Sequence, residues 1–210
     1  MIMKMLQKLV ALLLIAALSL ASASALAGVL APDDTDYEDL AGITVNATVG
    51  AFNEADQTFE VILYADDLFE IDDVEKLAAG DILLAGGQRF VITEKSVNEF
   101  DEVVAKCDAG WDIIFSQVGD DKMIAMIAED DRRFMHVFAV LHLPAAAGIT
   151  LEDASDPEGD PIVTTGLEEI LKIKQEKETN SNGLDFYATV ITLNNQLEIE
   201  RIHQDFDVAQ

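Results

Sequence analysis

The sequence has a single cysteine, Cys107, among its 210 residues. An intramolecular disulfide is therefore excluded, although small exported domains often depend on disulfides. The stability of the chain must come from a packed hydrophobic core, which a chain of this length can form. The residues around Cys107 match no nucleophile motif, and the neighbouring Asp108 would disfavour a reactive thiolate.

Basic residues are also scarce, because 13 Lys and Arg stand against 40 Asp and Glu, for a net charge of −27. Nucleic-acid binding normally needs clustered Lys and Arg, so we do not expect a nucleic-acid partner. Adsorption to anionic lipid is disfavoured for the same reason. A cationic partner or a divalent cation is compatible with this charge, and so is simple solubility.

Recognisable catalytic motifs are absent from the sequence. It contains no Gly-x-Ser-x-Gly, no His-Glu-x-x-His and no phosphate-binding glycine loop. The three histidines are His136, His142 and His203. On one strand, His136 and His142 would lie roughly 20 Å apart, too far for one metal ion. We expect each histidine to be hydrogen-bonded near a strand end, and we assign no catalytic residue.

The N-terminal 27 residues have the composition of a secretory signal peptide. A short segment with two lysines and no acid precedes an apolar run over residues 9–20, and small residues follow up to Ala27. The apolar run is shorter than the roughly 20 residues that a spanning helix requires. We therefore predict a signal peptide over residues 1–27, no transmembrane segment after cleavage, and a secreted or extracytoplasmic (cell-envelope) location.

Two cleavage sites fit this leader. The triplet ending at Ala27 would leave Gly28 as the first residue, and the triplet ending at Ala25 would leave Leu26. Cleavage before Gly28 removes two lysines and makes the net charge more negative, from −27 to −29, with 11 basic against 40 acidic residues. The acids and the proline over residues 31–40 indicate a disordered linker, which we place at residues 28–41. A single β-rich domain is expected over residues 42–210.

Alternating apolar and polar residues predict most strands of this domain. We expect a hairpin over 43–49 and 57–65, a second over 81–84 and 88–95, and a third over 111–118 and 122–128. A helical turn is predicted over 102–106. The nearly continuous apolar run 134–143, before Pro144, predicts a strand buried on both faces, and residues 145–164 are expected to form a loop.

The C-terminal part predicts a helix and a final hairpin. Thr165 is a suitable N-cap, with Glu168 as its capping-box partner, for a helix near 165–177. Strands over 186–193 and 196–202 flank Asn194-Asn195, and asparagine tolerates the positive φ of a tight turn. The apolar positions change parity between Ile199 and Ile202, which predicts a bulge. Together these elements predict a mainly β (α+β) fold, an antiparallel open barrel or sandwich built from hairpins, with one covering helix.

One acidic loop offers candidate metal ligands. Four carboxylates lie within eight residues, with Gly159 for a tight bend: Asp153, Asp156, Glu158 and Asp160. Calcium takes six to eight such oxygen ligands, and extracellular modules bind it weakly. The spacing does not match an EF-hand, so the loop is a candidate for weak calcium binding or a solvated turn. No other cofactor is expected.

The sequence favours an exported, non-enzymatic domain that binds an unidentified protein or small-molecule ligand or associates with the cell envelope. Two alternatives stay open. One is a secreted hydrolase whose site is assembled from dispersed carboxylates. The other is a calcium-stabilised extracellular structural module. Close pairs of acids do not decide between them, because 40 acidic residues produce such pairs by chance.

Overall fold

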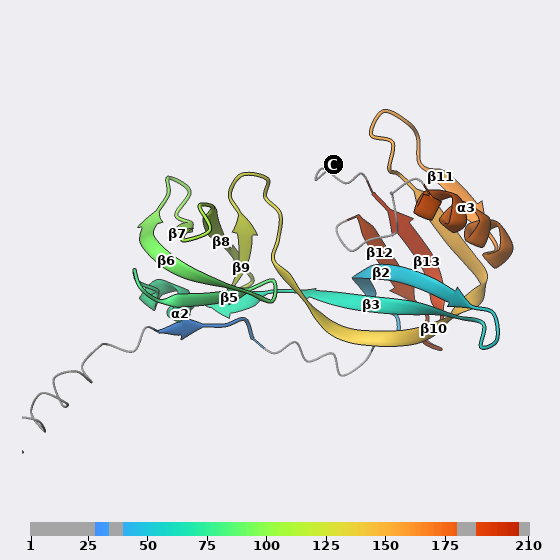
Figure 1. The fold of residues 1–210 in the computed structure, drawn as a ribbon, viewed down its shortest axis with the longest axis horizontal. Coiled ribbons are helices and arrows are strands. Elements are labelled where there is room, and N and C mark those ends of the chain that lie inside the picture. The colour runs from blue at the N-terminus through green and yellow to red at the C-terminus, as the bar shows by residue number, and fades with distance from the viewer. Residues whose placement is uncertain (1–27, 34–39, 180–187, 206–210) are drawn as a thin grey trace, which may run out of the picture.

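A computed structural model describes residues 28–33, 40–179 and 188–205. The predicted signal peptide, residues 34–39 of the predicted linker, residues 180–187 and residues 206–210 lie outside this part of the chain. The described chain forms two β-sheets that lie side by side along the long axis of the molecule (Figure 1). The mainly β fold predicted from the sequence is confirmed.

The seven-stranded sheet is made chiefly of a segment inserted between two strands of the other sheet. Its strand order is β1-β5-β6-β7-β8-β9-β4, and all neighbours pair antiparallel except β1 and β5. A short helix, α2 (Ile71–Lys76), follows β4. The strands are β1 (Val29–Leu30), β4 (Leu68–Glu70), β5 (Ile82–Ala85), β6 (Gln88–Val97), β7 (Val103–Cys107), β8 (Asp112–Val118) and β9 (Lys122–Ile127).

The six-stranded sheet curls into a nearly closed barrel. Its order is β11-β10-β13-β12-β2-β3, and β10 also pairs with β3. Strand β10 thus pairs with β3, the strand at the opposite end of the sheet, and this pairing brings the two ends together. The elements are β2 (Thr44–Asn53), β3 (Thr58–Asp66), β10 (Met135–Asp153), β11 (Ile162–Thr165), α3 (Leu167–Thr179), β12 (Thr189–Leu193) and β13 (Ile199–Gln204).

Strand β10 is much longer than the sequence predicted. Its first half pairs antiparallel with β3 and its second half pairs parallel with β13. The prediction of a strand that ends before Pro144, followed by a loop over 145–164, was therefore wrong. Pro144 is the last residue paired with β3, and Ala145 is the first paired with β13. A proline lacks the amide donor, and here it lies where the ladder changes partner.

Two further predictions about β10 and β7 were wrong. Val137 and Val140 of β10 are 52% and 59% exposed, so this strand is not buried on both faces. A helical turn was predicted over 102–106, but residues 103–106 belong to strand β7, which runs to Cys107. Val103, Ala105 and Cys107 are buried in alternation, which is the periodicity of a strand with one covered face.

The last hairpin forms as predicted, with a different turn. Thr192 pairs with Arg201 and Leu193 with Ile199, so Glu200 is the extra residue of the predicted bulge. The positive φ of the turn belongs to Leu197 (φ 60°) and not to an asparagine. The side chain of Asn194 instead accepts hydrogen bonds from the backbone amides of Gln196 and Glu198.

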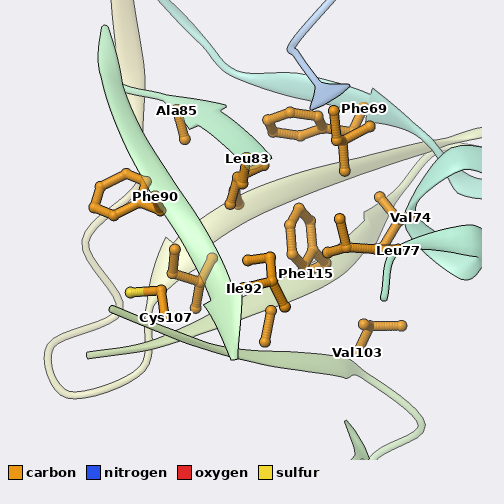
Figure 2. Close-up of a cluster of buried hydrophobic side chains, with 14 of the residues drawn as sticks. Phe69, Val74, Leu77, Leu83, Ala85, Phe90, Ile92, Val103, Cys107 and Phe115 are labelled. Carbon is orange, nitrogen blue, oxygen red and sulfur yellow. The ribbon is translucent and has the colours of Figure 1, made fainter. Parts of the chain in front are cut away.

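Each sheet encloses its own hydrophobic core. The core of the seven-stranded sheet contains Phe69, Phe90 and Phe115 (Figure 2). The core of the six-stranded sheet contains Phe59, Ile149 and Ile202. Ile170 of α3 is fully buried in the second core, so α3 is the predicted covering helix. That residues 42–210 fold as one unit stays a prediction.

Residues 28–33, part of the predicted linker, are ordered against the seven-stranded sheet. Val29 and Leu30 pair with Ile82 and Leu83 of β5, and Leu30 contributes to the core. No helix among the described residues is long and apolar enough to cross a membrane.

Candidate functional site

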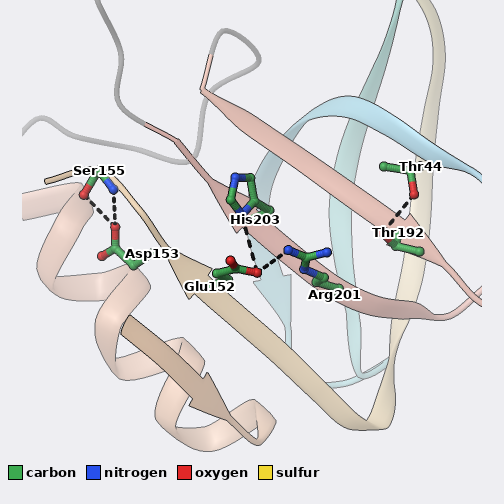
Figure 3. Close-up of polar contacts among 7 residues, drawn as sticks. All are labelled: Thr44, Glu152, Asp153, Ser155, Thr192, Arg201 and His203. Atoms are coloured by element: carbon green, nitrogen blue, oxygen red, sulfur yellow. Dashed lines mark hydrogen bonds and ion pairs between the residues drawn. The ribbon is translucent and has the colours of Figure 1, made fainter. Parts of the chain in front are cut away.

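The loop predicted to bind calcium begins at the end of β10. Asp153 is the last residue of that strand, and its Oδ1 accepts hydrogen bonds from the Ser155 amide (3.1 Å) and hydroxyl (2.6 Å) (Figure 3). Asp156 Oδ1 accepts a hydrogen bond from the Glu158 amide at 3.0 Å. A Cβ at Gly159 would lie 2.9 Å from Asp156 Oδ2. These contacts are typical of Asx turns that stabilise a reversal of the chain.

The structure does not gather these carboxylates into a metal cage. No group of three or more His, Cys, Asp or Glu side chains within residues 28–33, 40–179 and 188–205 is arranged to hold a metal ion. Asp153, Asp156, Glu158 and Asp160 all lie within these ranges. Calcium binding by this loop stays a prediction.

We expect calcium, magnesium and sodium chloride to stabilise the protein equally at matched ionic strength. Screening relieves the self-repulsion of a strongly acidic chain, and the carboxylates of Asp153 and Asp156 already accept local hydrogen bonds. Thermal melts in the three salts measure this. A calcium-specific gain would contradict it. With 10 mM calcium and a Kd of about 1 mM, that gain would be about 1.4 kcal/mol, and Asp156→Asn with Asp160→Asn would remove it.

Cys107, His142 and His136 contact different parts of the structure. Cys107 is buried in the core of the seven-stranded sheet (Figure 2). Its Sγ donates to the Trp111 carbonyl at 3.3 Å. His142 lies in β10 opposite Glu60 of β3. His136 is the second residue of β10, and its ring contacts an acid that sequence reasoning did not single out.

That acid is Asp67, which is fully buried where the chain passes from β3 to β4. Its Oδ1 lies 2.6 Å from His136 Nδ1, and its Oδ2 accepts the Gly86 amide at 2.5 Å. The Asp67 amide donates to the Phe134 carbonyl at 2.9 Å. One buried carboxylate therefore joins the β5–β6 turn, the start of β10 and the crossover between the two sheets.

Beside this junction lies a hollow that we call the arginine–tryptophan pocket. Its volume is about 270 Å³. It is formed by the β5–β6 turn, the β7–β8 connection, the end of β9 and the connection from β9 to β10. It is lined by Gly86, Gln88, Trp111, Ile127, Arg132, Arg133, Phe134 and Met135.

Aromatic rings support the floor of this pocket. The Phe90 ring lies between its neighbours, with centroid distances of 5.9 Å to Trp111 and 5.6 Å to Phe134. Gly86 has φ +57°, and a Cβ there would lie 3.0 Å from Phe134 Cδ1. A larger residue at position 86 would therefore be strained and would push against the ring that lines the pocket.

The pocket brings two cationic side chains together on an acidic chain. Arg132 and Arg133 are two of the four arginines in the sequence. Arg132 Nη2 lies 3.2 Å from Asp130 Oδ2, and Arg133 Nη1 lies 3.2 Å from Asp66 Oδ2. The Arg133 side chain is 57% exposed. A guanidinium has five N–H donors, so one ion pair leaves Arg133 able to donate to a bound anion.

A second hollow has the opposite charge. It has a volume of about 490 Å³ and is lined by Glu70, Ile71, Asp72, Asp73, Lys76, Asp120 and Asp121. Lys76 Nζ forms an ion pair with Asp73 at 3.1 Å. Acidic side chains exposed together are common on so acidic a protein, so this hollow does not by itself indicate a ligand. A cationic partner and a hydrolase with dispersed carboxylates stay predictions.

A polar cluster on the six-stranded sheet accounts for the third histidine. Arg201 donates to Glu152, and His203 Nδ1 lies 3.6 Å from Glu152 Oε2 (Figure 3). The hydrogen bond from Arg201 lowers the pKa of Glu152 below its usual value. Arg201 and His203 belong to β13 and Glu152 to β10, so the cluster ties the parallel pair of strands together.

The chain was compared with protein-family models, curated proteins and solved structures, and nothing matches it. The functional argument therefore depends on the site itself. Sequence reasoning missed the pocket, because its lining residues are scattered between positions 86 and 135 and form no recognised motif. The available signal was local: the only tryptophan and half of the arginines lie in connections between strands.

Proposed function

We propose that the protein is an exported, non-enzymatic binding domain that holds a small ligand in the arginine–tryptophan pocket. The ligand carries an anionic group, such as a carboxylate, next to a small flat apolar part. The observation that supports this proposal is the meeting of Arg132 and Arg133 with Trp111 around one hollow. Concave sites with an apolar lining and a few converging polar groups are the usual form of small-molecule sites.

The chemistry of the lining defines the ligand class. Guanidinium groups recognise carboxylates through paired N–H donors, and they are the preferred residues for this task. The indole of Trp111 and the ring of Phe134 offer flat apolar surface for the rest of the ligand. A volume of about 270 Å³ suits a ligand of few atoms.

Trp111 makes this proposal testable, because it is the only tryptophan in the sequence and its fluorescence reports on the pocket. We expect benzoate to change the Trp111 emission saturably, with a Kd on the order of 1 mM, as for a fragment of this size. Benzyl alcohol and benzylamine, which lack the anionic group, should bind much more weakly. Each of Arg132→Gln and Arg133→Gln should weaken benzoate binding about tenfold.

Arg89→Gln is the matched control, because Arg89 is an exposed arginine of β6 outside the pocket lining. It should bind benzoate like the wild type. An equal response to all three probes, or benzoate binding that survives both pocket substitutions, would overturn the proposal.

A further inference from the structure

The N-terminal residues that the structure describes connect the two edges of the seven-stranded sheet. At one edge, β1 pairs with β5, and the Ile82 amide donates to the Gly28 carbonyl at 2.8 Å. At the other edge, the Asp33 amide donates to the Leu68 carbonyl of β4 at 2.8 Å. In Figure 1, β1 lies beside β5 and α2.

Lys122 holds the far end of this segment. Its ammonium forms ion pairs with Asp33 and with Glu70 of β4. The hydrogen bonds to Asp33 and Glu70 raise the pKa of Lys122 above its usual value. The segment from Gly28 to Asp33 is therefore anchored at both ends.

The near end of the segment is held by Asp81. Asp81 Oδ1 accepts the Gly28 amide at 2.7 Å, and Oδ2 accepts the Ala78 amide at 2.8 Å. A Cβ on residue 28 would lie 3.0 Å from Asp81 Oδ1 and 3.1 Å from its Cγ. Glycine at position 28 therefore allows a carboxylate to lie directly against the backbone nitrogen of this residue.

We propose that Asp81 is the binding site for the mature N-terminus that cleavage before Gly28 creates. Hydrolysis by a signal peptidase breaks the amide bond between Ala27 and Gly28. Water supplies a hydroxyl to the Ala27 carbonyl and a proton to the Gly28 nitrogen. The α-amino group, with an ordinary pKa of about 7.7–8.0, is protonated at neutral pH. The hydrogen bond from a neutral amide to Asp81 then becomes an ammonium–carboxylate ion pair.

The contact with Asp81 favours cleavage before Gly28 over cleavage before Leu26. A chain that begins at Leu26 would carry its ammonium two residues before Gly28, up to roughly 7 Å from the Gly28 nitrogen. It would keep only the neutral amide at Asp81. The other charged groups around this position are Asp73 and Lys76 of α2, which form an ion pair with each other at 3.1 Å. Asp81 is thus the carboxylate in direct contact with residue 28.

The test compares three forms of the exported chain: one beginning at Gly28 with a free amine, the same chain acetylated at Gly28, and one beginning at Leu26. Acetylation keeps the N–H donor and removes the charge, so it is the matched control. At pH 6.5 the free Gly28 form should melt about 1–4 °C above the other two, as expected for one exposed ion pair in a chain of this size.

The pH dependence separates this ion pair from other effects. The carboxylate partner raises the pKa of the α-amino group in the folded state, so the stabilisation is full below the unfolded pKa of about 8 and is lost as the pH rises through the folded pKa. The advantage should therefore disappear by about pH 10.

Asp81→Asn is compared within its own background, because the substitution also weakens the bond to Ala78. In that background the free and acetylated forms should melt together. Equal melting of all three forms at pH 6.5, or an advantage that survives Asp81→Asn, would overturn the inference. So would mass spectrometry that finds the exported protein beginning at Leu26. None of these measurements depends on ligand binding near Trp111, so the two proposals fail independently.

Discussion

Replacing Asp67 with alanine should lower the free energy of unfolding by about 2–4 kcal/mol. Asp67 is fully buried and accepts hydrogen bonds from the Gly86 amide and from His136. Alanine removes the carboxylate that both groups contact at the point where the two sheets meet. The loss of hydrogen bonds to a buried charged group costs more than the loss of neutral surface bonds.

Urea denaturation followed by circular dichroism measures this change. Asp120→Ala is the control, because Asp120 is an exposed acid in the turn between β8 and β9, and it should stay within about 0.5 kcal/mol of the wild type. Asp67→Asn, which retains an oxygen acceptor, should be intermediate. If Asp67→Ala were as stable as Asp120→Ala, the junction described here would not stabilise the fold.

Phe115→Ala should cost about 3–5 kcal/mol, the largest effect that we expect from a single substitution. Phe115 is fully buried, and its ring packs edge-on against Phe69 with a centroid distance of 5.5 Å (Figure 2). Alanine removes most of the side chain from a packed interior that cannot fully collapse around the cavity. Phe100→Ala is the control, because Phe100 is 74% exposed.

The same unfolding curves test whether residues 42–210 form one folding unit. Trp111 packs against the core of the seven-stranded sheet, so its fluorescence follows that part of the molecule. Circular dichroism follows both sheets. A single unit predicts coincident transitions by the two probes in the wild type and in Phe115→Ala. If fluorescence alone shifted in the variant, the two cores would unfold separately, and Phe59→Ala should then shift the other transition.

Local periodicity predicted the parts of the fold that local chemistry determines. The alternation over 43–49 and 57–65 gave β2 and β3 their correct faces, with Ala47, Val49 and Val61 buried. The parity change after Ile199 predicted the bulge in β13. In each case one face of a strand packs on a core, so every second residue must be apolar.

Pairing between distant segments could not be predicted in this way. The second half of β10 is a strand because β13, some fifty residues further along, provides its partner. It begins with Ala-Ala-Ala-Gly over residues 145–148, which have low intrinsic preference for a strand, so the pattern indicated a loop. The prediction of the turn at Asn194-Asn195 failed for a different reason. The side-chain hydrogen bonds of Asn194 fix the turn, and the positive φ falls on Leu197.

The arginine–tryptophan pocket was hidden for the same long-range reason. Gly86, Trp111 and Arg132 lie in three different connections, and only the strand order of the seven-stranded sheet brings them together. Likewise, Asp67 and His136 are 69 positions apart in the sequence. The loop from Asp153 to Asp160 was predicted to bind calcium because its carboxylates are close in sequence. In the described part of the chain, they do not form a group that could hold a metal ion.

The most direct test of the proposed binding function is to locate an anionic probe in the protein. Crystals of the chain from Gly28 onward, soaked in 4-bromobenzoate, would reveal the probe through the anomalous scattering of bromine. The proposal predicts one dominant bromine peak in the arginine–tryptophan pocket, with the carboxylate on Arg132 or Arg133 and the ring against Trp111. A dominant peak elsewhere, or an empty pocket at a probe concentration that saturates the fluorescence change, would contradict it.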